Sequence, residues 1–189
     1  MSSHEIKGIF KACGADIYFE TKGTGDNMLF LHAGIADSRM WDYEFDMMAK
    51  HFRVIRLDLP GYGQSGFSGG QFSYSTIIKD LLDHLNADLV HIIAACFGGK
   101  IALDFALEYP HSCVSMALLS PAVGGWKDSI FLQEYEKEEE RLLSEGKIEE
   151  AALLNVNVWI TGERKEDSVD SKVKELVMDM QLTSLRKQE

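Results

Sequence analysis

The chain has 189 residues, of which 46% are apolar and 26% charged, a composition that can form a soluble domain with a sizeable core. Its net charge of −11 comes from 30 acidic residues against 19 lysines and arginines, which argues against binding to nucleic acid or to anionic membranes. Three cysteines without paired spacing indicate free thiols and a cytoplasmic location. No stretch approaches the roughly 18 apolar residues of a membrane span.

Short strands and helices alternate along the first two thirds of the chain. Residues 5–10 and 16–21 are β-rich runs around a turn, which predicts a hairpin. The predicted order from residue 27 is strand, helix, strand, helix, strand, helix, strand, with strands at 28–33, 53–59, 88–95 and 113–120 and helices at 38–52, 75–85 and 97–109. Ser38 is the expected cap of the first helix. Such alternation is typical of a parallel sheet covered by helices on both faces.

The composition changes after residue 125. Residues 127–150 contain many more acids than bases, which indicates an exposed helix. The remainder also has a helical pattern, except for residues 155–162, which fit a strand or a helix. We therefore expect two parts, a sheet-based core over residues 1–125 and a helical lid or cap region over residues 126–189.

The run "IIAACFGGK" places Cys96 between a predicted strand and a predicted helix, the arrangement called a nucleophile elbow. Such a sharp turn requires a strained backbone at the nucleophile and small residues around it, here Ala94 and Gly98, while Gly99 allows the helix to pack close to the strand. The helix N-terminus also favours a thiolate. Taken alone, this motif is equally consistent with a buried cysteine that has no chemical role.

Two other motifs follow the neighbouring strands. "FLHAGIADSRMWD" begins at Phe30 and leaves backbone N–H groups free, and "DLPGYGQS" begins at Asp58. With the elbow, in this order and spacing, they resemble the α/β-hydrolase superfamily over about residues 4 to 125. The first motif and the lid-like segment are most similar to the esterase and enol-lactone hydrolase branch.

The resemblance implies an α/β fold, a doubly wound, mostly parallel sheet built from the hairpin and four parallel strands, with a helical lid. It also implies hydrolysis of small carboxylic esters, lactones or thioesters without a metal or organic cofactor. Cys96 stands at the nucleophile position, and Phe97 and Gly34 would supply the N–H groups of the oxyanion hole. The candidate substrate-binding residues are His32, Ile35, Trp126 and Trp159. Asp58 is expected to fix its loop rather than to catalyse.

The partners of the nucleophile are missing from the expected places. In this family an acid and a histidine follow the nucleophile in the chain, whereas the only histidine after Cys96 is His111, at the far end of a helix and about 20 Å away. We therefore expect these 189 residues to be a truncated or split form. Three interpretations stay open: an incomplete hydrolase, a non-catalytic protein of the same fold that binds a small molecule or a partner, and a degenerate product.

The predicted strand at residues 113–120 carries no charge and has no later strand beside it in this chain. Uncharged edge strands tend to pair with other chains. We therefore expect self-association, or complementation by another fragment, through this edge.

Overall fold

The computed structural model describes residues 5–67, 69–127, 129–165 and 168–187. The chain divides into two compact units, Met1–Val123 and Gly124–Glu189. Among the described helices, none combines the length and the apolar character needed to cross a membrane.

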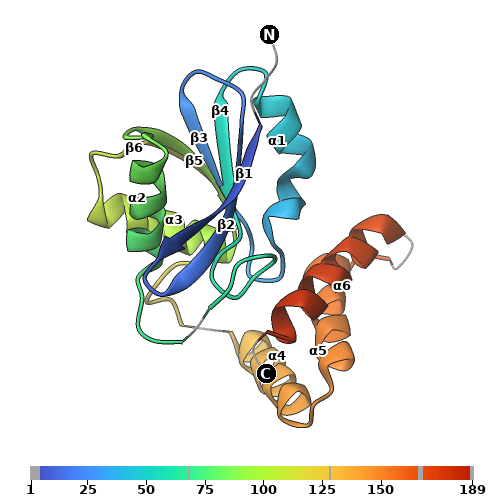
Figure 1. The fold of residues 1–189 in the computed structure, drawn as a ribbon. Coiled ribbons are helices and arrows are strands. Elements are labelled where there is room, and N and C mark those ends of the chain that lie inside the picture. The colour runs from blue at the N-terminus through green and yellow to red at the C-terminus, as the bar shows by residue number, and fades with distance from the viewer. Residues whose placement is uncertain (1–4, 68, 128, 166–167, 188–189) are drawn as a thin grey trace. The chain divides into compact units, whose positions relative to one another are not determined.

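The first unit contains a six-stranded sheet of order β1-β2-β4-β3-β5-β6 (Figure 1). The strands are β1 (Ile6–Ala12), β2 (Ala15–Lys22), β3 (Asn27–Leu31), β4 (Arg53–Leu57), β5 (Val90–Ala95) and β6 (Cys113–Leu119). The strands β3, β4, β5 and β6 pair in parallel, and the antiparallel hairpin β1–β2 joins β4 antiparallel through β2. The predicted hairpin and four-stranded parallel sheet are confirmed.

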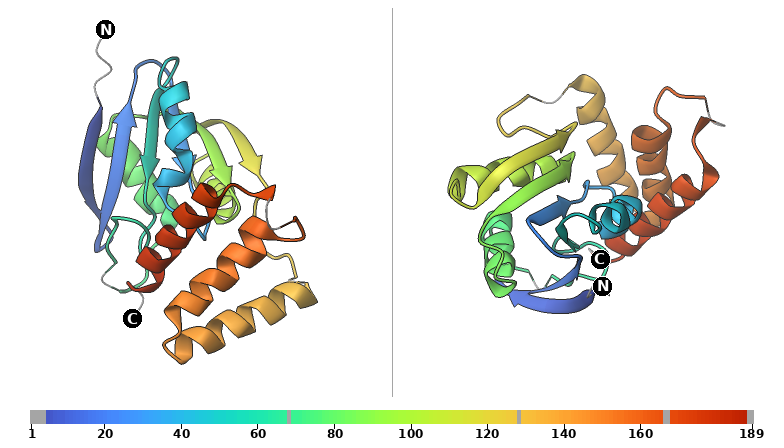
Figure 2. Two further views of the ribbon diagram at one scale, coloured as in Figure 1. Left: turned by 90° about the vertical axis from the view of Figure 1, so that its right-hand side faces the viewer. Right: turned by 90° about the horizontal axis from the view of Figure 1, so that it is seen from above.

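Helices cover both faces of this sheet (Figure 2). The 3₁₀ turn η1 (Ser38–Trp41) and α1 (Asp42–Met48) pack on one face, and α2 (Tyr74–His84) and α3 (Phe97–Glu108) pack on the other. The two cores form because alternate side chains of each strand point to opposite faces. The core under α1 contains Met28, Phe30, Trp41, Phe45, Val54 and Ala95, and the larger core under α2 and α3 includes Leu29, Ile55, Leu81, Ile92 and Phe105.

The start of the first helical segment differs from the prediction. Asp37, not Ser38, is the cap, because its carboxylate Oδ1 accepts the N–H of Arg39 at 3.0 Å. Ser38 is already part of the 3₁₀ turn, and its own N–H donates to Oδ1 of Asp58 at 2.8 Å. The backbone of this segment is therefore fixed by two aspartates from different elements.

The second unit consists of α4 (Ile130–Ser144), α5 (Ile148–Asn155), the π-helix η2 (Val156–Thr161) and α6 (Ser171–Leu185). The ambiguous run 155–162 is thus mainly helical. The buried Asn155 joins the three α-helices, because its Nδ2 donates to Glu139 of α4 at 2.6 Å and to Gln181 of α6 at 2.5 Å. The small apolar core of this unit includes Leu142, Ile148, Ala151, Ala152 and Leu185.

Candidate active site

Cys96 lies between the last residue of β5 and the first residue of α3, with φ 49° and ψ −114°. L-residues rarely adopt this conformation, and it persists only where the surrounding structure enforces it. The N–H of Cys96 donates to the carbonyl oxygen of Leu119 at 3.0 Å, and its carbonyl accepts the N–H of Ala122 at 3.0 Å. The end of β6 and the residues after it hold the turn, and the strained backbone predicted at Cys96 is confirmed.

Two glycines allow the elbow to pack closely. A Cβ atom at Gly98 would lie 2.6 Å from the carbonyl oxygens of Leu31 and His32, and a Cβ atom at Gly99 would lie 2.6 Å from Cβ of Pro121. Both distances are far below a normal van der Waals contact. The first turn of α3 therefore lies directly against the end of β3, and this contact brings the loop after β3 to the elbow.

The strain at Cys96 predicts an unusual response to glycine. We expect Cys96→Gly to have a free energy of unfolding about 1 kcal/mol higher than that of Cys96→Ala, because glycine adopts positive φ without a steric penalty. The control is Ala95→Gly, one residue earlier in β5, which should lose about 1 kcal/mol relative to the wild type. Urea unfolding of the three variants measures these differences, and equal stability of glycine and alanine at position 96 would contradict the strain.

The loop after β3 brings Gly34 to the start of α3. A Cβ atom at Gly34 would lie 3.4 Å from Cβ of Phe97 and 3.9 Å from the hydroxyl oxygen of Tyr62. The N–H of Phe97 has no carbonyl of its own helix to bond to, because Phe97 is the first residue of α3. Within the described ranges, the N–H groups of Gly34, Ile35 and Phe97 have no hydrogen-bond partner. Unpaired N–H groups from two elements therefore lie beside the thiol-bearing residue.

His32 has a structural role instead of the predicted contact with substrate. Its side chain is completely buried, its Nε2 accepts the N–H of Leu59 at 2.9 Å, and its Nδ1 lies 2.8 Å from the carbonyl oxygen of Ala33. Burial lowers the pKa of His32, so the ring is neutral, and a proton on Nδ1 satisfies both contacts. The ring has no nitrogen left for a ligand and fixes the loop after β3 to the residues after β4.

Asp58 joins the same two loops and is almost fully buried. Its Oδ1 accepts the N–H of Ser38 at 2.8 Å, and its Oδ2 accepts the N–H of Gln64 at 2.7 Å. These bonds fix the loop after β3 against the "DLPGYGQS" loop. The contacts agree with the structural role that we expected for this aspartate.

The described histidine rings whose contacts are known bond to, or pack against, residues other than Cys96. His111 follows the C-terminal end of α3, at the opposite end of the helix from the elbow. His91 contacts Oγ of Ser115 through Nδ1 at 2.8 Å, and His84 packs against Phe10 with ring centroids 4.9 Å apart. In the portion of the chain with assigned positions, no imidazole is hydrogen-bonded to Cys96.

The other predicted substrate-binding residues are divided between the two units. Ile35 is partly buried and follows Gly34 in the first unit. Trp126 and Trp159 belong to the second unit, with exposed fractions of 82% and 40%. Trp159 lies on the π-helix and packs edge-on against Tyr135, with ring centroids 5.4 Å apart. The structure therefore groups Cys96, Gly34, Phe97 and Ile35 in one place.

Two further residues of this region had not been predicted, Tyr62 beside Gly34 and Arg56 beside Ser38. Tyr62 packs against the His32 ring with centroids 5.0 Å apart, in addition to its approach to Gly34. Arg56 is buried in β4 and donates to the carbonyl oxygen of Ser38, the first residue of η1. A signal for Arg56 was present, because an arginine inside the apolar run "RVIRLDL" must find a buried partner.

Comparison with known proteins gives one family and a consistent fold. Residues 26–145 match the family model described as alpha/beta hydrolase fold. The chain is 29% identical over 121 residues to the dihydrolipoyllysine-residue acetyltransferase component of an acetoin cleaving system from Cupriavidus necator, covering 62% of this chain and 32% of that protein. It is 35% identical over 114 residues to an uncharacterized protein of Mycobacterium tuberculosis, and the match covers 58% of this chain and 33% of that protein. The chain thus spans about a third of the length of these curated relatives.

Solved structures match almost the whole chain. An enol-lactonase from Burkholderia xenovorans superimposes with a TM-score of 0.79 at 16% identity, covering 95% of this chain and 69% of that one. A carboxylesterase from Bacillus subtilis superimposes with a TM-score of 0.77 at 19% identity, and the match covers 96% of this chain and 61% of that one. At these identities the likeness establishes the fold.

Proposed function

The chain belongs to the α/β-hydrolase family, and from this premise we propose that it carries the nucleophile side of a hydrolase site for carboxylic esters, lactones or thioesters. The observation that supports the proposal most strongly is the strained conformation of Cys96 between β5 and α3. The fold shared with an enol-lactonase and a carboxylesterase supports the choice of esters and lactones as substrates.

In the proposed reaction, the thiolate Sγ of Cys96 attacks the carbonyl carbon of the substrate. The oxygen of the tetrahedral intermediate accepts hydrogen bonds from the N–H groups of Phe97 and Gly34, and each such donor contributes about 3 kcal/mol in known enzymes. The intermediate collapses by breaking the bond to the leaving group, which takes up a proton, and an acyl thioester forms on Cys96. Water then hydrolyses this thioester to the free acid.

The second unit is proposed to act as a lid. A large part of the side chain is exposed at Trp126, which precedes α4, and at Trp159 of the π-helix, and aromatic side chains are suited to contact an apolar acyl group. The proposed substrates are small molecules, because the net charge of −11 opposes binding to a nucleic acid. The three unpaired thiols favour a reducing compartment such as the cytoplasm.

A second candidate function is binding of a small carbonyl or carboxylate compound, or of a partner, without turnover. It is supported by the hydrogen bonds of the described histidines, since none of those bonds goes to Cys96. The same N–H groups would then bind a ligand oxygen, and the thiol would remain unmodified.

We expect the 189-residue chain to release about one equivalent of p-nitrophenol from p-nitrophenyl acetate in a burst, and then to turn over slowly. Acylation needs the thiol and the N–H donors, whereas deacylation needs a general base, which commonly contributes about 10²–10⁴-fold. Stopped-flow absorbance measures both phases. Cys113→Ala should keep the burst and Cys96→Ala should lose it. A full burst in Cys96→Ala would refute the hydrolase proposal, and no burst in any variant would favour the non-catalytic function.

A further inference from the structure

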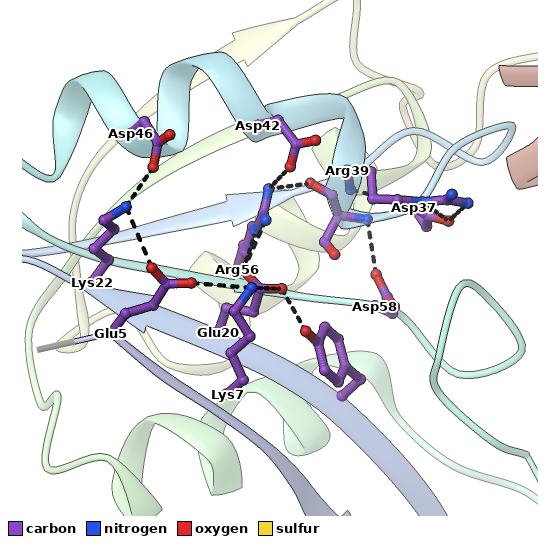
Figure 3. A network of polar contacts seen from close by, with 12 residues as sticks. Glu5, Lys7, Glu20, Lys22, Asp37, Arg39, Asp42, Asp46, Arg56 and Asp58 are labelled. Carbon is purple, nitrogen blue, oxygen red and sulfur yellow. Dashed lines mark hydrogen bonds and ion pairs between the residues drawn. The ribbon is translucent and has the colours of Figure 1, made fainter. Parts of the chain in front are cut away.

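A row of charged side chains crosses three strands on the face of the sheet that α1 covers. Lys7 of β1 lies opposite Glu20 of β2, and Glu20 lies opposite Arg56 of β4 (Figure 3). Oε2 of Glu20 accepts from Nη2 and Nε of Arg56 at 2.8 and 3.1 Å, and Nζ of Lys7 lies 3.3 Å from Oε1. Only 5% of Glu20 and 7% of Arg56 is exposed. The strand register therefore creates a buried ion pair.

Glu20 is ionised in this setting. Burial alone would raise the pKa of Glu20, but hydrogen bonds from the Tyr18 hydroxyl and the Arg56 guanidinium outweigh burial and lower it. Arg56 is also charged and lies over the ring of Phe45, with Cζ 4.3 Å from the centroid. Glu20 thus holds one edge of the guanidinium and leaves Nη1 directed away from the pair.

Nη1 of Arg56 reaches the segment that follows Gly34. It donates to the carbonyl oxygen of Ser38 at 3.1 Å and to Oδ1 of Asp42 at 2.5 Å. Since the N–H of Ser38 is bonded to Asp58, both backbone polar groups of Ser38 are fixed by buried charged side chains. Ser38 is four residues after Gly34.

A buried ion pair is weak evidence for stability, because an apolar pair of the same volume often gives an equally stable protein. What an apolar pair cannot supply is a set of directed hydrogen bonds to a carbonyl oxygen of a loop. The planar guanidinium bonds to Glu20, Ser38 and Asp42 at the same time, a geometry that lysine does not reproduce. These contacts suit a group that fixes a loop position.

We propose that Arg56, aligned by Glu20, is a positioning residue that sets the N–H of Gly34 beside that of Phe97. The proposal rests on the proposed function, in which these two groups bind the substrate oxygen. Arg56 would act through a chain of hydrogen bonds that runs from Glu20 through its guanidinium to the backbone of Ser38.

Arg56→Met in the 189-residue chain tests the proposal, with Lys22→Met as the matched control. Lys22 lies on β2 two residues after Glu20, and its ion pairs go to Asp46 and Glu5 instead of the loop (Figure 3). Hydrogen exchange measured by NMR should be at least about tenfold faster at Ser38 and Ala36 in Arg56→Met, while Ile92 in β5 stays unchanged. The burst rate constant should fall about tenfold with little change in the half-saturating ester concentration, because a displaced oxyanion donor acts mainly in the transition state.

Lys22→Met should change neither the loop exchange rates nor the burst rate constant by more than about twofold. Arg56→Lys should restore only part of the slow exchange and of the burst rate constant that Arg56→Met loses. If Arg56→Met does not fold, Glu20→Gln keeps the side-chain volume and should show the same pattern more weakly. Loop exchange in Arg56→Met that equals the exchange in Lys22→Met would overturn the positioning role. A wild-type chain without a burst would refute the proposed function, and the exchange data would still decide the role of Arg56 in the loop.

Discussion

Gly98→Ala is expected to lower the free energy of unfolding by about 3 kcal/mol, the upper end of the usual cost of overpacking. The added methyl group would lie 2.6 Å from the carbonyl oxygens of Leu31 and His32. These are backbone atoms at the end of a central strand, so they cannot move aside without breaking the contact between β3 and α3. The substitution should also abolish the ester burst, because it separates the loop of Gly34 from the elbow.

Gly66→Ala is the matched control for this substitution. A Cβ atom at Gly66 would lie 3.7 Å from Cβ of Asp16, an ordinary contact, and alanine there should change stability by less than about 1 kcal/mol. Thermal and urea unfolding of both variants measure the difference. A Gly98→Ala variant as stable as Gly66→Ala would mean that the elbow packs less tightly than the structure shows.

Two copies of the chain are expected to associate through β6, an edge strand of the sheet. This strand pairs only with β5 among the described strands, and its residues Val114, Met116 and Leu119 are exposed. An uncharged edge strand presents unpaired N–H and C=O groups to a second copy. We expect the chain to sediment as a dimer or larger species at low-micromolar concentration, and Ala117→Lys, at an exposed position of β6, to shift it to the monomer.

Ile9→Lys in β1 is the control, because β1 is the opposite edge of the sheet and already contains Lys7 and Lys11. Lysines on an edge oppose pairing between chains, so this variant should keep the association of the wild type. Analytical ultracentrifugation distinguishes the cases. A monomeric wild type over the same concentration range would contradict the prediction.

The order of elements and the elbow were predictable from the sequence because both depend on local patterns. Apolar runs bounded by glycine and proline predicted β3 to β6 in the right order. The strain at Cys96 follows from a strand, a small-residue turn and a helix within ten residues, and the structure has that conformation. The π-helix at Val156–Thr161 had no local signal of this kind, because its sequence fits either a strand or a helix.

The roles of buried polar residues were not predictable, because they depend on contacts between distant segments. His32 was expected to contact substrate, but its nitrogens bond to Leu59 and Ala33, and the first of these contacts exists only once β3 and β4 are paired. Glu20 and Arg56 are 36 residues apart and meet only through the register of β2 with β4. The N–H of Ser38, the residue expected to cap this segment, likewise bonds to the distant Asp58, and Asp37 provides the cap.

The position of the acyl group after the burst decides whether Cys96 is the nucleophile. The chain is treated with p-nitrophenyl acetate, quenched in acid and digested, and the acetylated peptide is identified by mass spectrometry. All three cysteines are free thiols, with Cys13 exposed and Cys113 partly exposed like Cys96, so Cys13 and Cys113 serve as internal references for chemical reactivity alone. We expect acetyl on Cys96 at near-stoichiometric yield, with little on the other two cysteines. Equal acetylation of the three thiols, or acetyl absent from Cys96, would contradict it.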